Sequence, residues 1–158
     1  MMNASLPATD KQGFSALCIV RKVLATAESI PLSAIQLAAR VAIANVFWNS
    51  AQSKLLSWPT TLQLFALEYR VPVLPPEIAA PLATATELTG SILILLGLFT
   101  RLGALALLGI VAVIQLFVYP GDWGVLLLWA SLLGLLLARG AGVVSLDQLG
   151  RRLILGNR

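Results

Sequence analysis

Arg40 and Glu87 are charged residues inside stretches that are otherwise apolar and long enough to cross a membrane. A charged side chain at the centre of a bilayer costs about 2.5–3.5 kcal/mol on insertion scales, so such residues are rare and mark candidate sites. Opposite charges at similar depth on sequential helices offset each other's cost. Together they can also bind the polar head of a ligand or exchange a proton. We therefore predict a buried ion pair between Arg40 and Glu87.

Polar residues accompany both members of the predicted pair. Gln36 lies one helical turn before Arg40, and Thr84 and Ser91 share the helical face of Glu87 at i−3 and i+4. Hydroxyl side chains on such a face allow close helix approach and offer hydrogen bonds. Two interpretations stay open. The group is either a structural clamp that sets the register of two helices or a ligand pocket for a polar head such as a quinone ring.

Metal and haem chemistry have little support in the sequence. It contains no histidine and a single cysteine, Cys18. Histidine is the commonest metal ligand and a frequent axial ligand of haem. We therefore expect this chain to ligate neither a metal nor a haem, and one cysteine cannot form an intramolecular disulfide.

The composition is that of a membrane protein. Hydrophobic residues make up 58% of the 158 residues and charged residues only 11%, whereas soluble domains carry about 25% charged residues. The formal net charge is +4. No basic segment interleaved with aromatic residues is present, so we assign this charge to contacts with anionic lipid and expect no nucleic-acid partner.

Four apolar blocks predict an all-α integral membrane protein built as a four-helix bundle. The predicted spans cover residues 31–55, 76–99, 102–119 and 123–138, within one domain of residues 31–138. The fourth span is close to the lower limit of about 17 residues. The longest connection, residues 56–75, has apolar residues at helical spacing. It predicts a short helix at the mouth of the bundle, either re-entrant or interfacial.

The segments outside the spans predict the orientation. Residues 1–30 are expected to form a tail and a short amphipathic surface helix, and residues 139–158 a basic tail. Cytoplasmic segments carry an excess of lysine and arginine. With the N-terminus inside, the outer segments hold only Lys54 and Arg70, which predicts that both termini are cytoplasmic. The inner basic residues are then Lys11, Arg21, Lys22, Arg101, Arg139, Arg151, Arg152 and Arg158.

A series of short motifs follows in order between residues 35 and 150. The motifs are Arg40, Phe47-Trp48, Lys54, Val71-Pro72, Glu87-Leu88-Thr89-Gly90, the run 96–102 (LGLFTRL) and the run 140–147 (GAGVVSLD). Their order and spacing resemble the DoxX family of small bacterial membrane proteins. The resemblance implies a multi-pass protein of the bacterial inner membrane and adds Lys54, Arg101 and Asp147 as motif positions. Many relatives carry glycine, and often histidine, in the stretch before the lysine, whereas residues 49–53 here read NSAQS.

The function implied by the resemblance is a redox one. Relatives are linked to quinone-coupled oxidation of thiosulfate and to membrane oxidoreductase complexes that handle oxidative stress and thiols. The chain would then be a membrane subunit or accessory factor of such a complex, with quinone as cofactor and other subunits as partners. Two alternatives stay open: a scaffold that recruits soluble partners, and a small transporter or channel formed by a homo-oligomer. The sequence leaves undecided whether the chain is an enzyme; if it is, it would be a subunit of a membrane oxidoreductase.

Overall fold

The computed structural model describes residues 21–22, 31–70, 72 and 74–155. Regular structure in these residues is entirely helical, which confirms the predicted all-α class. The surface helix predicted within residues 1–30 lies outside the described residues, apart from Arg21 and Lys22, which are helical. The elements are α2 (Leu32–Leu56), α3 (Trp58–Leu64), η1 (Phe65–Tyr69), α4 (Pro76–Leu96), α5 (Thr100–Val113), η2 (Ile114–Val118), α6 (Trp123–Arg139) and α7 (Leu146–Leu155).

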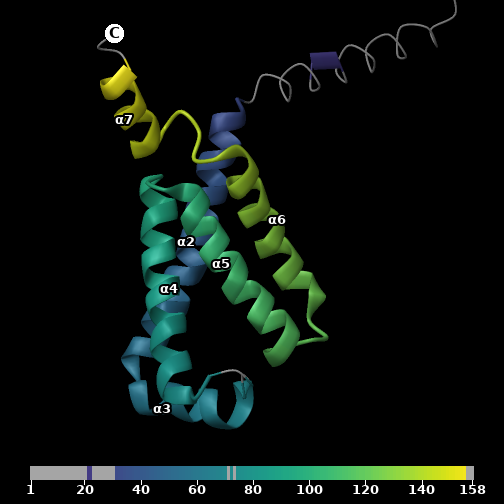
Figure 1. The fold of residues 1–158 in the computed structure, drawn as a ribbon. Helices are drawn as coiled ribbons and strands as arrows, with labels where there is room; N and C mark the ends of the chain where they lie inside the picture. Colours follow the sequence, from purple (N-terminus) through teal and green to yellow (C-terminus); the bar gives the residue numbers. More distant parts are fainter. Residues whose placement is uncertain (1–20, 23–30, 71, 73, 156–158) are drawn as a thin grey trace, which may run out of the picture.

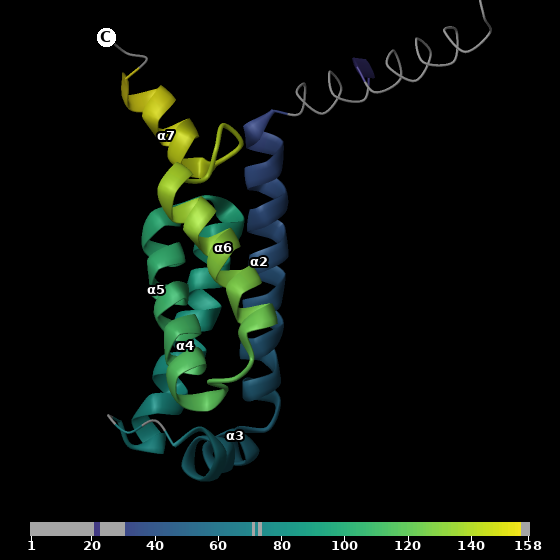
Figure 2. The same ribbon diagram turned by 90° about the vertical axis from the view of Figure 1, so that its right-hand side faces the viewer.

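The long helices α2, α4, α5 and α6 pack side by side around one apolar core (Figures 1 and 2). Helix α2 contacts α4 and α6, and α5 contacts the same two helices from the other side. Gly90 allows α4 and α5 to approach closely, because a Cβ there would come within 2.8 Å of Leu107. The core residues include Ile43, Phe47, Ile94, Leu107, Leu133 and Leu136.

The outward faces of these helices are apolar as well. Ile35, Val41, Leu105 and Leu127 are each about half exposed or more. Exposed apolar surface of this extent suits lipid rather than water. Among the described residues, two stretches are long and apolar enough to cross a membrane, α4 and the continuous helix Thr100–Val118, while α6 is apolar but shorter.

The two ends of the molecule differ. Helix α3 and the π-helical turn η1 fold across one end, and α7 lies at the opposite end, where α2 begins and α6 ends (Figures 1 and 2). Helix α7 is held to the turn between α4 and α5. The Asp147 backbone N–H donates to the Gly97 carbonyl over 3.0 Å, and the Asp147 carboxylate accepts from the backbone N–H of Phe99 over 3.0 Å.

Candidate functional site

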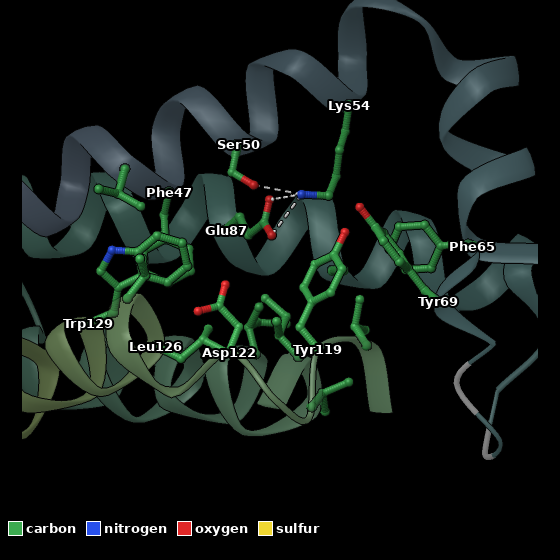
Figure 3. A pocket seen from close by; sticks show the side chains of 17 residues that line it. Phe47, Ser50, Lys54, Phe65, Tyr69, Glu87, Tyr119, Asp122, Leu126 and Trp129 are labelled. Carbon is green, nitrogen blue, oxygen red and sulfur yellow. Dashed lines mark hydrogen bonds and ion pairs between the residues drawn. The ribbon is translucent and has the colours of Figure 1, made fainter. Parts of the chain in front are cut away.

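A cavity of about 290 Å³ lies between the long helices at the end covered by α3 and η1. Side chains from α2, η1, α4, α5, η2 and α6 reach it (Figure 3). Most of its surface is aliphatic or aromatic, and the polar groups are few. The lining residues are Val46, Phe47, Ser50, Lys54, Phe65, Tyr69, Ala83, Glu87, Ile110, Val113, Ile114, Val118, Tyr119, Asp122, Val125, Leu126 and Trp129.

The Lys54–Glu87 ion pair borders this cavity. The Lys54 Nζ donates to Glu87 Oε2 over 2.7 Å and to Oε1 over 2.9 Å. It also donates to the Ser50 Oγ, one turn earlier on α2, over 2.8 Å. The two charged side chains are 16% and 3% exposed. All three donors of the ammonium group are directed at oxygen acceptors, so the pair is held in a single geometry.

Two tyrosines lie beside the ion pair and narrow the cavity (Figure 3). The Tyr69 and Tyr119 rings meet edge to face with centroids 6.5 Å apart. The Tyr119 hydroxyl donates to Glu68 Oε1 over 3.0 Å, which ties η1 to the end of η2. Burial raises the pKa of the Tyr69 hydroxyl, and the carboxylates of Glu68 and Glu87 raise it further. Both phenols therefore stay protonated, and able to donate a hydrogen bond, well above neutral pH.

The segments that carry this part of the wall are both π-helical. Phe65 and Tyr69 belong to η1, and Ile114 and Val118 belong to η2. A π-helical turn adds a residue to the helical repeat, shifts the side chains that follow, and is frequent at functional sites. Residues of both π-helical turns therefore line the same cavity.

The opposite wall combines aromatic rings with a carboxylate. Phe47 and Trp129 are in ring contact, with centroids 5.9 Å apart, and the Asp122 side chain projects into the cavity beside Leu126 (Figure 3). The cavity therefore offers flat apolar walls, an ammonium group, carboxylates and phenolic hydroxyls. This set suits a flat, mostly apolar molecule with oxygen atoms on its ring. Among the described residues no group of three or more potential metal ligands is found.

Arg40 does not form the predicted pair with Glu87. Within the described residues its guanidinium donates only to backbone carbonyls: to Ile94 over 2.8 Å, Leu95 over 2.5 Å and Ala141 over 3.2 Å, and also to Val144. Ile94 and Leu95 belong to the last turn of α4. Helix C-termini leave carbonyls without partners and carry partial negative charge, so they stabilise a buried cation without a carboxylate.

The helix register explains why the prediction was wrong. Arg40 lies beside Ile94, and Glu87 is seven residues earlier on α4, which is about 10 Å of helix rise. Lys54 is fourteen residues after Arg40 on α2, about 21 Å of helix rise. Its long side chain points back toward the start of α2 and reaches the Glu87 carboxylate. Depth counted from the ends of each predicted helix had placed Arg40 and Glu87 level with each other.

The other predicted site residues are divided between the two ends. The Gln36 Nε2 donates to the carbonyls of Arg139 over 3.3 Å and Gly140 over 3.0 Å, so Gln36 binds the end of α6 much as Arg40 binds the end of α4. Thr84 and Ser91 are buried, but their hydroxyls donate to carbonyls of their own helix. Neither joins Arg40 to Glu87.

The family-motif positions lie in both regions. Lys54 is in the cavity, whereas Arg101 and Asp147 lie at the opposite end. The Arg101 guanidinium donates to the Ala138 carbonyl over 3.3 Å, and the Asp147 carboxylate accepts from the first N–H groups of α5.

Tyr69, Tyr119, Asp122 and Trp129 were not predicted as site residues. They come from η1, from the turn between η2 and α6, and from α6, and η1 meets the other two only in the folded chain. The helical spacing that includes Tyr69 was the one signal that could have placed it at the mouth of the bundle. Tyr119 and Asp122 are typical of a membrane-edge turn, a pattern that gives no sign of a cavity behind it.

The comparisons with known proteins identify a family. A family model described as DoxX matches residues 35–120, just over half of the 158 residues. This range contains most of the residues that line the cavity, including Lys54 and Glu87. No curated protein and no solved structure gives a significant match.

Proposed function

The chain belongs to the DoxX family, and from this premise we propose that it is a multi-pass protein of the bacterial inner membrane. In this proposal α2, α4, the helix α5–η2 and α6 each cross the bilayer, and both termini are cytoplasmic. The apolar outward faces support four crossings. The 17 residues of α6 meet the lower limit of about 17 for a span. The excess of lysine and arginine beside α7 supports the orientation.

We propose that the cavity beside Lys54 and Glu87 binds the ring of a quinone or quinol. The observation that carries this proposal is the buried ion pair at the edge of an apolar space of about 290 Å³. Ligand pockets measure roughly 300–1,000 Å³, so this cavity is large enough for a ring but not for a long tail. The apolar tail of such a molecule would remain in the surrounding lipid.

The chemistry of the lining fits that ligand. A quinone is a flat apolar ring whose carbonyl oxygens accept hydrogen bonds. Phe47 and Trp129 provide flat aromatic walls, and the Tyr69 hydroxyl provides a donor near the ion pair (Figure 3). The Lys54 ammonium, whose three donors are taken by Ser50 and Glu87, provides a positive charge beside the ring oxygens. Glu87 accepts from Lys54 and keeps the ammonium in place. These residues would bind and orient the ring and hold protons beside its oxygens.

The proposed role is that of a membrane subunit or accessory factor of a redox complex. The sequence holds no histidine and one cysteine, so we assign the supply of electrons to a partner subunit with its own redox centre. The bound quinone would supply the electron-accepting chemistry. This chain would bring the quinone to that partner and shield it from bulk water.

The test is to measure quinone that co-purifies with the protein in mild detergent, by extraction and mass spectrometry. We expect near-stoichiometric quinone with the wild type and at least a tenfold loss in Lys54→Met and Glu87→Gln, because either change breaks the ion pair that borders the ring; a tenfold loss corresponds to about 1.4 kcal/mol. The matched control is Glu77→Gln, the same change in the first turn of the same helix, at an exposed position away from the cavity. A wild-type preparation with only bulk lipid would refute quinone binding, as would equal quinone in all variants.

A further inference from the structure

A second cavity, of about 490 Å³, lies at the end of the molecule that carries α7. It is formed where the start of α5, the end of α6 and the first turns of α7 meet. Its composition is unlike that of the first cavity, because charged and small residues dominate. The residues that line it include Phe99, Arg101, Leu102, Arg139, Asp147 and Arg151.

Three arginines from three different helices converge on this cavity. Arg101, Arg139 and Arg151 are exposed, and within the described part of the chain none of them forms an ion pair. Arg101 uses one donor on the Ala138 carbonyl over 3.3 Å, which fixes its guanidinium beside Gly140. Arginine presents five donors in a planar fork that matches the oxygens of a phosphate group.

Among the described residues a single carboxylate lines the cavity, and it does not balance these charges. Asp147 accepts from the backbone N–H groups of Phe99 over 3.0 Å and Thr100 over 3.4 Å. It is therefore engaged in capping α5 and in holding α7 to the turn after α4. Three positive charges against one negative charge leave the cavity positive, which favours an anion.

Apolar side chains surround the charged group. Phe99 and Leu102, which line the cavity, are 61% and 63% exposed. On α7, Leu146, Leu149 and Leu153 are exposed at i, i+3 and i+7, so they form one apolar stripe. An amphipathic helix with arginine on its polar face and leucine on the other lies in the plane of a membrane interface.

We propose that this cavity binds the phosphate headgroup of an anionic phospholipid, with the acyl chains over Phe99, Leu102 and the leucine stripe of α7. The placement at the membrane edge rests on the four-span arrangement proposed above. A free phosphate ester carries the same anionic group. It has no acyl chain, however, that would contact the apolar residues around the cavity. Basic pockets at the cytoplasmic ends of membrane helices bind anionic headgroups in this way.

The experiment is native mass spectrometry of the full chain in detergent, titrated with dioleoyl-phosphatidylglycerol or with dioleoyl-phosphatidylcholine. We expect tighter binding of phosphatidylglycerol, and about fivefold weaker binding in Arg151→Ala, because one basic residue near an anionic surface contributes about 1 kcal/mol. The matched control is Arg152→Ala, which removes the same charge from the next position of α7 but does not line the cavity. Arg139→Ala provides a second variant of the cavity on a different helix.

Three results would overturn the lipid site. The first is equal binding of the two lipids, and the second is an equal loss in Arg151→Ala and Arg152→Ala. The third is displacement of phosphatidylglycerol by millimolar glycerol 3-phosphate, which would assign the cavity to a free phosphate ester. Quinone is measured in the same preparations, so failure of the lipid site and failure of the Lys54–Glu87 site are told apart.

Discussion

Removal of one partner of the Lys54–Glu87 ion pair is expected to destabilise the protein much more than removal of both. Lys54→Met leaves the Glu87 carboxylate, 3% exposed, without its cation. Breaking a buried pair in this way costs about 3–5 kcal/mol. We expect a value near the lower end, about 3 kcal/mol, because the Lys54 side chain keeps 16% of its surface exposed. Glu87→Met should lose a similar amount, because it leaves the ammonium unpaired.

The double variant Lys54→Met/Glu87→Met tests the reasoning. Apolar residues of similar volume can replace a buried ion pair with little loss or even a gain in stability. The double variant should therefore lie within about 1 kcal/mol of the wild type, which gives a coupling energy of at least about 5 kcal/mol. Thermal unfolding in detergent, followed by far-ultraviolet circular dichroism, measures this as a fall in Tm of about 6–12 °C in each single variant. Additive losses in the double variant would refute the reasoning.

The same double variant separates stability from ligand binding. It restores the apolar packing around the cavity while removing both charged groups that we assign to the quinone ring. It should therefore unfold like the wild type and yet co-purify without quinone. A stable double variant that retains quinone would show that the ion pair serves the fold alone.

Three further predictions concern the remainder of the described chain. Arg40→Lys should lower the free energy of unfolding by about 2–3 kcal/mol, because an ammonium group cannot replace the planar fork that reaches four carbonyls; equal Tm values would contradict this. Gly97→Ala should destabilise by about 2 kcal/mol or more, since Gly97 has φ 68° and a Cβ there would lie 2.7 Å from the Arg40 Nη2. Gly109→Ala is the matched control, with nothing within 4 Å of its Cβ, and a Gly97 variant as stable as this control would refute the strain. The pKa of Tyr69 is raised from 10.0 by burial, so its stabilising effect is complete below pH 10 and is lost as pH rises through the folded value. The fall in Tm at alkaline pH should be smaller in Tyr69→Phe than in the wild type. Identical profiles of Tm against pH in the two proteins would argue against this stabilising effect of Tyr69.

The helical class could be predicted from the sequence because its signals are local. Apolar blocks, Pro31 and Pro76 at helix starts, and Gly97 and Gly140 at helix ends require no knowledge of the partner helices. That the structure is all-helical is confirmed, and two of the predicted spans meet the length and composition required for crossing. Membrane crossing by the other two remains a prediction.

The partners of the charged residues could not be predicted because they depend on register. The level of α4 against α2 is set by how α3 and η1 fold back, and no short pattern encodes that offset. Arg40 illustrates a second limit. Its partners are main-chain carbonyls at the end of α4 and in the segment before α7, and a sequence shows only side chains. A search for a carboxylate partner therefore led to Glu87, although Lys54 was nearer in space.

The space around each charged residue distinguishes a structural clamp from a ligand site. Arg40 is 2% exposed, and a Cβ at Gly97 would already come within 2.9 Å of its Cζ, so no ligand fits beside its guanidinium. Its hydrogen bonds join α2, the end of α4 and the segment before α7, which is what a clamp requires. Glu87 is equally buried, but it and Lys54 border an apolar cavity of about 290 Å³ that packing has left unfilled. Since protein interiors are otherwise close-packed, we infer that Arg40 serves the fold and that the ion pair serves a ligand.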